Sequence, residues 1–303
     1  MIWPRACALF GTDRGLPGRA AASTLTAFVS VCHPMLDHPV RLAVFDIDGT
    51  LLGPGYPLGR PQIQALARLH EAGITLALAS SRQRASLLDL AEAIGLPLYL
   101  VSYNGPLVNA PDGTRISATD IALPAGLGSA LADFVDAGGC VHCYTVDDWQ
   151  AFGPDWRIDN EAAGRHAVPS RRAASLTPAT LPPRALKILC DGDLPALAAV
   201  RAAVAAEPGL VMNWSGSECH DIHARHASKG DGLRQLCRHL SIDTGHTIAF
   251  GDADSDISML STAGTGFAMG AANARVTAAA DRRLGAPGSG ELEALLAEIA
   301  ATV

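Results

Sequence analysis

The chain has 303 residues, of which 49% are hydrophobic and 17% charged, and its formal net charge is −7. At a prior of about 150 residues per domain, this length suggests two domains. The negative net charge argues against a broad nucleic-acid-binding surface, which would need clustered Lys and Arg. No apolar run in the sequence approaches the roughly 20 residues needed to span a bilayer. We therefore expect partners other than nucleic acid or membrane.

The N-terminal 34 residues are rich in Ala, Arg and Gly and show no clear periodicity. Their apolar stretch near Ala27–Val31 is short for the core of a signal peptide. Met35 stands just before the first predicted strand. The hypothesis is that residues 1–34 are a disordered extension or that the functional polypeptide starts near Met35.

Seven cysteines are scattered along the chain. An odd, scattered set favours reduced thiols and a cytoplasmic protein over a disulfide framework. Cys140 and Cys143 form one CxxC motif without a second pair at finger-like spacing, so we interpret them as ordinary core or strand residues.

The most informative stretch is an apolar run, Leu42–Phe45, that ends in Asp46 and Asp48. A short apolar run bounded by a turn signal is typical of a buried strand in a parallel sheet. Ligands of such sheets bind beyond the carboxyl ends of the strands. Two carboxylates this close repel each other unless one takes a proton or both share a cation. A hard divalent cation such as Mg²⁺ fits this need.

Strand and helix patterns then alternate along the chain. The first part is predicted to hold a helix over 61–72, a strand over 74–79, a helix over 85–94 and a strand over 98–101. After about Asn109 the pattern becomes that of an α+β insertion, with a helix over 127–137, strands over 141–146, 186–190, 210–214 and 219–223, a helix over 194–206 and a loop-rich stretch over 149–183. The alternation then resumes with a helix from 229, a strand over 247–250, a helix from 257, a strand over 266–269 and a last helix over 291–300. Strand–helix–strand alternation with short links predicts a parallel sheet with right-handed crossovers.

These patterns predict three parts. They are the N-terminal extension (1–34), a catalytic core (35–109 and 225–303) and a cap domain inserted into it (110–224).

Polar groups stand at four predicted strand ends or helix starts: Asp46 with Asp48, Ser80, Lys229, and Asp252 with Asp256. Taken singly, Ser80 is an ordinary helix cap, Lys229 a surface charge, and Asp256 a carboxylate favoured by a helix dipole. Their joint occurrence at successive tips of one sheet indicates a site instead.

With these motifs the chain resembles the haloacid dehalogenase (HAD) superfamily of phosphohydrolases, and most closely the Cof-type sugar-phosphatase branch with a type IIB cap. The resemblance spans about residues 40–280. It is carried by the motifs Asp46–Thr50, Ser80–Arg82, Asn104–Gly105, Lys229–Gly230 and Gly251–Leu260. It implies an α/β fold with a Rossmann-like parallel-sheet core and an inserted α+β cap domain.

The resemblance also implies a Mg²⁺-dependent phosphatase of small phosphorylated metabolites such as sugar phosphates. Asp46 would attack phosphorus and form an aspartyl-phosphate, Asp48 would transfer protons, and Lys229 would neutralise charge. Phosphoryl transfer needs this kind of positioning and charge stabilisation. The implied phosphate or substrate contacts are Ser80, the backbone N–H groups near Ile47 and Ser81, Asn104, Gly105, Lys229 and Ser255. The implied metal site comprises Asp46, the carbonyl oxygen of Asp48, Asp252, and Asp256 as a direct ligand, through a water or as a support of the ligands.

Two motifs depart from the pattern of this branch. Ser80-Ser81 replaces the common Thr-Gly, which keeps a hydroxyl but crowds the adjacent backbone. Ser255 stands where Asn is usual and has a shorter reach.

Substrate selection is expected to come from the insertion. Its candidates, without assigned roles, are His142, Trp149, Trp156, Arg157, Arg165 and His166. His220, His223 and His226 recur every three residues, a spacing that does not converge on one metal across a strand and a loop.

Alternatives remain open. A phosphomutase on the same core would need a bisphosphate activator and a second phosphate site. A non-catalytic phosphate-binding module is the other alternative. The loss of Asp46 or Asp48 would favour it, but both aspartates are present. A Rossmann-type nucleotide binder is not supported, because no GxGxxG follows the first strand. We expect a small phosphorylated substrate and a monomer or weak homodimer.

Overall fold

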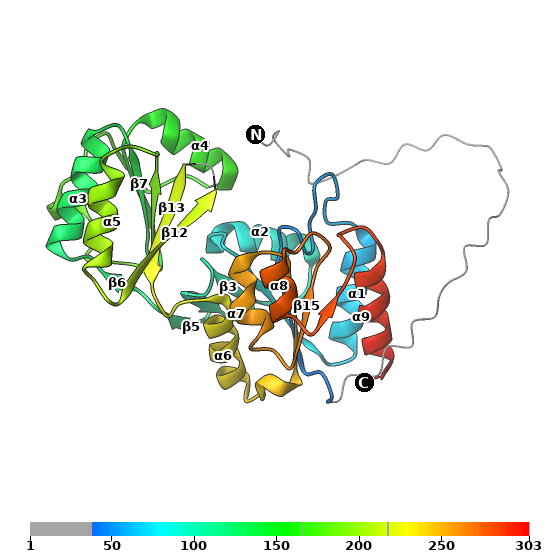
Figure 1. Ribbon diagram of the computed structural model, residues 1–303. Coiled ribbons are helices and arrows are strands. Elements are labelled where there is room, and N and C mark those ends of the chain that lie inside the picture. The colour runs from blue at the N-terminus through cyan, green and yellow to red at the C-terminus, as the bar shows by residue number, and fades with distance from the viewer. Residues whose placement is uncertain (1–37, 166, 217, 303) are drawn as a thin grey trace, which may run out of the picture.

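The computed structural model describes residues 38–165, 167–216 and 218–302. The expectation for residues 1–34 lies outside this described part. Two units are visible in Figure 1, each built on its own sheet: a larger one formed by both ends of the described chain, and a smaller one formed by the middle. This arrangement confirms the predicted α/β core with an inserted cap domain.

The larger sheet has eight strands in the order β16-β15-β14-β1-β2-β3-β4-β5. Neighbouring strands from β16 to β3 pair in parallel, whereas β4 and β5 are antiparallel additions at the edge. The strands are β1 (Leu42–Phe45), β2 (Thr75–Ala79), β3 (Leu98–Ser102), β4 (Leu107–Asn109), β5 (Arg115–Ala118), β14 (Thr247–Gly251), β15 (Thr265–Ala268) and β16 (Arg282–Arg283). Strand β1 lies between β14 and β2, so its carboxyl end meets theirs.

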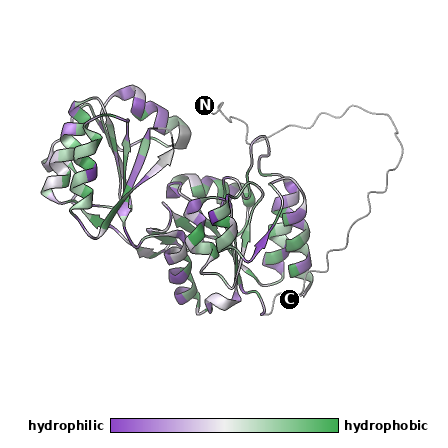
Figure 2. Cartoon of the chain, in the orientation of Figure 1, coloured by the Kyte–Doolittle hydropathy of each residue, from purple (hydrophilic) through white to green (hydrophobic). Residues whose placement is uncertain are grey.

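Helices cover both faces of this sheet. One face packs against α1 (Arg60–Glu71), α2 (Arg84–Ile94) and α9 (Glu291–Thr302), and the other against α6 (Lys229–Leu240), α7 (Ile257–Leu260) and α8 (Ala274–Ala279). The side chains of β1 alternate between the two cores, with Ala43 and Phe45 on the first and Leu42 and Val44 on the second. Burial on both faces explains the uninterrupted apolar run in the sequence. The helices carry both hydrophilic and hydrophobic residues, as Figure 2 shows.

The insertion has a six-stranded sheet in the order β12-β13-β11-β7-β8-β9. Its strands are β7 (Cys140–Tyr144), β8 (Trp149–Phe152), β9 (Arg171–Ala173), β11 (Lys187–Asp191), β12 (Leu210–Gly216) and β13 (Cys219–Ala224). Helices α3 (Ala125–Asp136) and α5 (Leu197–Ala205) cover one face, and Ile158 of α4 (Asp155–Arg165) packs on the other. A short ladder of β6 (Ile121–Ala122) and β10 (Arg184–Ala185) completes the unit.

Two expectations about the insertion differ from the structure. Strand β5 pairs with β4 as the edge of the larger sheet, so residues 115–118 lie with that sheet and not with the insertion as predicted. The stretch 149–183, predicted to be loop-rich, contains β8, α4 and β9. Its Arg, Pro and Ser residues are typical of loops, so the sequence did not indicate these elements. In addition, α4 buries little apolar surface and β9 is only three residues long, so neither has a clear apolar pattern.

Within the described part of the chain, no helix combines the length and apolar character needed to cross a membrane.

Candidate active site

Asp46 comes directly after β1 and is only 5% exposed. Its amide donates to the carbonyl of Phe250 in β14 (2.9 Å), which continues the parallel ladder by one residue. The chain then turns at Gly49, whose φ is +96°. A Cβ on Gly49 would overlap the carboxylate of Asp252, so glycine lets the two loops approach each other here.

Lys229 is the first residue of α6 and is 2% exposed. The preceding residue, Ser228, caps the helix, since its hydroxyl accepts a hydrogen bond from the Asp231 amide (3.2 Å). A cation at a helix N-terminus is disfavoured by the helix dipole, so local helix stability does not explain this lysine. Its Nζ donates instead to Asp46 Oδ1 (2.5 Å) and Asp256 Oδ1 (2.6 Å).

Asp252 and Asp256 follow β14. Asp256 is fully buried, and its Oδ2 accepts hydrogen bonds from the amides of Asp252 (3.1 Å) and Ala253 (3.0 Å). Asp256 therefore fixes the loop that carries Asp252 and also holds Lys229. Carboxylate oxygens of Asp46, Asp252 and Asp256 lie within 4.8 Å of one another.

Burial and mutual repulsion shift the acidity of these groups. Burial, together with repulsion from Asp256, raises the pKa of Asp46 to about 7, although Lys229 lowers it. Burial and Asp256 also raise the pKa of Asp252, to about 6. Burial alone would lower the pKa of Lys229, but Asp46 and Asp256 outweigh it and raise that pKa. The carboxylates thus lack sufficient positive charge nearby.

The acidic cluster fits a hard divalent cation. Three carboxylates and one ammonium leave an excess of two negative charges. Asp252 Oδ1 is buried and has no hydrogen-bond partner among the described residues, an arrangement that is costly unless another ligand satisfies it. Oxygen donors of this kind are what Mg²⁺ prefers. Asp46 and Asp252 are the residues placed to hold it, and Asp256 supports both.

The carboxylate of Asp48 lies outside this cluster, whereas the metal ligand that the resemblance implies is its carbonyl oxygen. Its side chain is 57% exposed, and both of its oxygens accept from the Arg82 guanidinium, from Nε at 2.9 Å and from an Nη at 2.5 Å. Such a two-point contact fixes the orientation of a carboxylate. Arg82 received no role from the sequence, although it ends the Ser80–Arg82 motif. The signal that was missed is the position of Arg82 shortly after the end of β2, from which a guanidinium can reach a carboxylate that follows the neighbouring strand β1.

Ser80 lies at the end of β2 and is 1% exposed. Its hydroxyl accepts from the Arg82 amide (3.2 Å), and its carbonyl accepts from the Asn104 amide (2.8 Å). Tyr103, Asn104 and Gly105 all have positive φ, and a Cβ on Gly105 would overlap the carbonyl of Ser228. The tips of β2 and β3 and the start of α6 are therefore packed against one another.

The other residues that were expected to contact the substrate do not lie in the acidic cluster. Ser255 is exposed. The contacts implied for Ile47 and Ser81 are their backbone amides, and neither amide donates to a backbone carbonyl of the described residues. Arg157 of the insertion pairs with Asp191 (2.8 Å) and Glu218 (3.3 Å). The side chain of Arg165 and all of His166 lie outside the description.

The cysteine and histidine groups do not converge. Cys140 and Cys143 are three residues apart in one strand and belong to apolar clusters on opposite faces of the insertion sheet. His220 and His223 are likewise three apart in β13 and so project to opposite faces.

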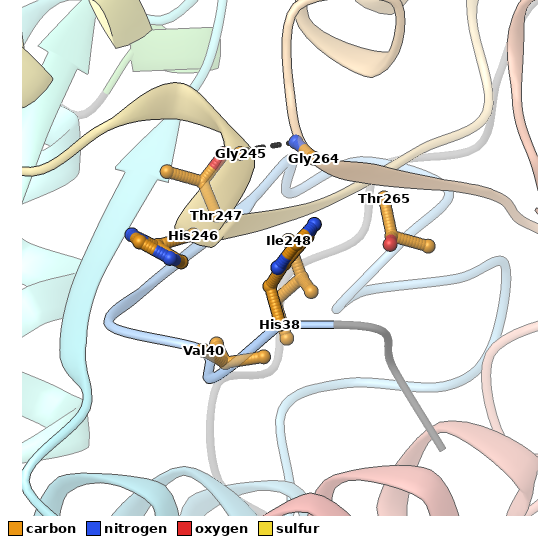
Figure 3. Close-up of a pocket in the computed structure, with 8 residues that line it drawn as sticks. All are labelled: His38, Val40, Gly245, His246, Thr247, Ile248, Gly264 and Thr265. Carbon is orange, nitrogen blue, oxygen red and sulfur yellow. Dashed lines mark hydrogen bonds between the residues drawn. The ribbon is translucent and has the colours of Figure 1, made fainter.

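A small pocket of about 190 Å³ lies at the opposite end of the larger sheet (Figure 3). His38 and Val40 before β1 and residues around the start of β14 and β15 line it, with the Gly264 amide donating to Thr247 Oγ1 (3.3 Å). It is formed at the amino ends of the strands, whereas the acidic cluster lies at their carboxyl ends.

Comparisons with known proteins identify the family of the chain. The model of the haloacid dehalogenase-like hydrolase family matches residues 43–286. An HMP-PP phosphatase of Cronobacter sakazakii is 31% identical over 233 residues, which cover 76% of this chain and 84% of the relative. An HMP-PP phosphatase of Escherichia coli O157:H7 is 30% identical over 243 residues, with the same two coverages.

Solved structures share the fold. A haloacid dehalogenase-like hydrolase from Bacteroides thetaiotaomicron superposes with a TM-score of 0.74 at 22% identity, covering 86% of this chain and 99% of that one. A HAD subclass IIB sugar phosphatase gives a TM-score of 0.70 at 22% identity, with coverages of 86% and 98%. The chain therefore belongs to the haloacid dehalogenase-like hydrolase family, as its motifs predicted, and within that family to the phosphatases.

Proposed function

We propose that this protein is a Mg²⁺-dependent phosphatase that hydrolyses small phosphorylated metabolites through a phosphorylated Asp46. The observation that carries the proposal is the contact of the Lys229 ammonium with Asp46 beside a second, partly unsatisfied carboxylate, Asp252. A buried nucleophile, a fixed cation and a divalent-metal site together meet the needs of phosphoryl transfer.

In the first step an oxygen of Asp46 attacks phosphorus, and the bond between phosphorus and the leaving oxygen breaks. Asp48 gives a proton to that oxygen, so a phosphate monoester releases an alcohol and a diphosphate such as HMP-PP releases the monophosphate. In the second step water attacks the aspartyl-phosphate while Asp48 takes its proton, which restores Asp46 and releases inorganic phosphate. Mg²⁺, when bound, offsets the negative charge of the nucleophile and the phosphate.

Other side chains have supporting roles. Lys229 orients Asp46 and favours its ionised form, because its ammonium stabilises the charged carboxylate that burial disfavours and so lowers the pKa of Asp46. Asp256 holds Lys229 from the other side and orders the Asp252 loop. Arg82 orients Asp48. Ser80 and the turn at Asn104 and Gly105 lie at the adjacent strand tips, where the phosphate group would contact them.

The first substrate to test is HMP-PP, because the HMP-PP phosphatases named above match over 76% of this chain. Sugar phosphates are the alternative class, which the motif pattern favours. We also propose that the protein acts in the cytoplasm.

The test is a panel assay of phosphate release from HMP-PP, glucose 6-phosphate, fructose 1,6-bisphosphate and 4-nitrophenyl phosphate, with Mg²⁺ and with EDTA. The expected result is hydrolysis of at least one compound with Mg²⁺ and none with EDTA. Full activity in EDTA would contradict the metal requirement, and hydrolysis of none would contradict the proposal.

A further inference from the structure

The first turn of α6, which carries Lys229, contains backbone amides that the helix itself cannot satisfy. The first four amides of an α-helix have no carbonyl partner within the helix. In α6 the Asp231 amide donates to the hydroxyl of the capping residue Ser228 (3.2 Å). The Gly230 amide donates to another element, because its acceptor is the hydroxyl of Ser258 in α7 (3.1 Å). The start of α6 is therefore capped partly from α7.

Ser258 belongs to the segment that also holds the side chain of Lys229. Asp256 lies two residues before it, at the start of α7, and accepts a hydrogen bond from Lys229 Nζ (2.6 Å). A lysine ammonium sits on a flexible four-carbon stem, so a contact at the ammonium alone leaves the stem several conformations. The Ser258 contact fixes the backbone next to Lys229 as well. The two contacts together determine where the stem starts and where it ends.

The two helices approach each other closely at this point. Both pack on the same face of the larger sheet, where Figure 1 shows them. A Cβ on Gly230 would lie 2.4 Å from the Ser258 carbonyl oxygen and 3.0 Å from Thr262 Oγ1. A side chain at this position would push the helices apart, so the close approach requires glycine. This gives a role to Gly230, the second residue of the Lys229–Gly230 motif.

Further hydrogen bonds surround the contact between Gly230 and Ser258. The Ser228 hydroxyl donates to Asp231 Oδ2 (2.7 Å). Arg234 donates to Asp231 Oδ1 (2.8 Å) and to the Thr262 hydroxyl (2.9 Å). The Thr262 hydroxyl donates in turn to the Ser258 carbonyl (2.6 Å). These bonds form a closed path that joins the start of α6 to α7.

The bond between Gly230 and Ser258 is the member of this path that matters most for Lys229. The Arg234 and Asp231 side chains are 50% and 33% exposed, and exposed ion pairs contribute little to stability. Gly230 is buried, so its amide would be costly to leave without an acceptor. It also directly follows Lys229 in the chain.

Loss of the Ser258 hydroxyl has a definite structural consequence. The buried Gly230 amide would lose its acceptor, so the start of α6 is expected to shift until the amide meets water or another acceptor. The Cα of Lys229 would move with it. Asp46 would stay in place, because its amide donates to the Phe250 carbonyl in β14. The ammonium and the nucleophilic carboxylate would then be misaligned.

We propose that Ser258 is a positioning residue of the active site: its hydroxyl holds the first turn of α6 against α7 and so keeps the Lys229 ammonium directed at Asp46. This inference rests on the proposed phosphatase function and adds to it a residue that acts through Lys229. Ser258 lies in the Gly251–Leu260 motif, but the sequence assigned it no role.

The test is steady-state kinetics with Mg²⁺ on the panel compound that the wild-type protein hydrolyses fastest. Ser258→Ala is expected to lower kcat about fivefold, the size expected for the loss of one neutral hydrogen bond. KM is expected to change less than about twofold, because the misalignment affects the chemical step. Ser258→Thr keeps a hydroxyl and is expected to retain at least about half of the wild-type kcat.

The matched control is Ser261→Ala. Ser261 lies three residues further along, at the end of α7, and its hydroxyl donates to the carbonyl of Ala279 in α8 (3.4 Å). This substitution removes the same chemical group from the same segment but leaves the start of α6 unchanged. Its kcat is expected to equal that of the wild type. Thermal unfolding of all three variants is expected to show that each is folded at the assay temperature.

An unchanged kcat in Ser258→Ala would overturn this inference. Equal losses in Ser258→Ala and Ser258→Thr would also overturn it, because the hydroxyl would not be the cause. An equal loss in Ser261→Ala would assign the effect to α7 in general and not to the contact with α6. In each of these cases the wild-type protein remains an active phosphatase. A wild-type protein that hydrolyses no compound of the panel would overturn the proposed function and, with it, this inference.

Discussion

The Nζ of Lys229 lies 2.5 Å from Asp46 Oδ1 and 2.6 Å from Asp256 Oδ1, although 183 residues separate Lys229 from Asp46. One ammonium thus joins the tips of β1 and β14 at the start of α6. All three side chains are almost completely buried. An ion pair of this kind is weak evidence for stability, since its desolvation is costly. Its position at the strand ends favours a functional explanation.

Asp46→Asn is expected to lower kcat at least about 10³-fold, because an amide cannot act as the nucleophile. The fold should persist, since the amide occupies the same space and Asp256 still pairs with Lys229. Phosphate release and the circular-dichroism melting curve measure the two effects. Asp89→Asn, at an exposed position on α2, is the matched control. Substantial turnover by Asp46→Asn would argue against covalent catalysis.

Lys229→Met is expected to lower the free energy of unfolding by about 3–5 kcal/mol without Mg²⁺, because two buried carboxylates lose their cation. Urea denaturation at pH 8 measures this loss. Arg275→Met is the comparison: it removes the exposed pair with Asp254 and should cost less than about 1 kcal/mol. Equal effects of the two variants would show that Lys229 does not compensate the cluster.

The strand tips were predictable because they have a local signature. Buried parallel strands read as short apolar runs, and the polar residue that ends each run must lie at the same edge of the sheet. The structure accordingly brings Asp46, Lys229, Asp252 and Asp256 together. Sequence order and strand direction were sufficient to group Asp46 with Asp252 and Asp256, whereas Lys229 begins α6 and its place depends on how that helix packs.

Other features depend on pairing that no local pattern encodes. Residues 115–118 were assigned to the insertion, because their sequence does not indicate that they form a strand, β5, at the edge of the larger sheet. The contact of Arg82 with Asp48 joins two turns, and its geometry depends on how both turns fold.

Mg²⁺ is expected to stabilise the wild-type protein, by about 2.7 kcal/mol at a concentration 100 times its dissociation constant. Asp252→Asn should remove most of this stabilisation, since Asp252 supplies the unsatisfied oxygen of the cluster. Thermal unfolding with and without Mg²⁺ measures it independently of activity. Asp254→Asn, two residues away and exposed, is expected to respond to Mg²⁺ like the wild type. A full response by Asp252→Asn would place the metal elsewhere.

Arg82→Lys is expected to lower kcat about tenfold with little change in stability. Lysine keeps the charge but cannot make the two-point contact that orients Asp48. The pair is partly exposed, so its loss should cost at most about 1 kcal/mol. Steady-state kinetics separate this role from substrate binding, which would raise KM instead. Arg68→Lys, exposed on α1, is the control and should leave kcat unchanged.

Gly105→Ala is expected to reduce both stability and kcat, whereas Gly95→Ala should reduce stability alone. Both glycines have positive φ, +122° for Gly105 and +73° for Gly95, so alanine strains the backbone at each, by about 1–2 kcal/mol. A Cβ at position 95 meets nothing within 4 Å, but one at 105 overlaps the backbone of Ser228. Ser228 caps α6 and precedes Lys229, so relieving the overlap must displace the start of that helix. Urea unfolding and the kcat of the two variants test this: a kcat that is equally preserved in both would mean that the β3 turn does not position Lys229.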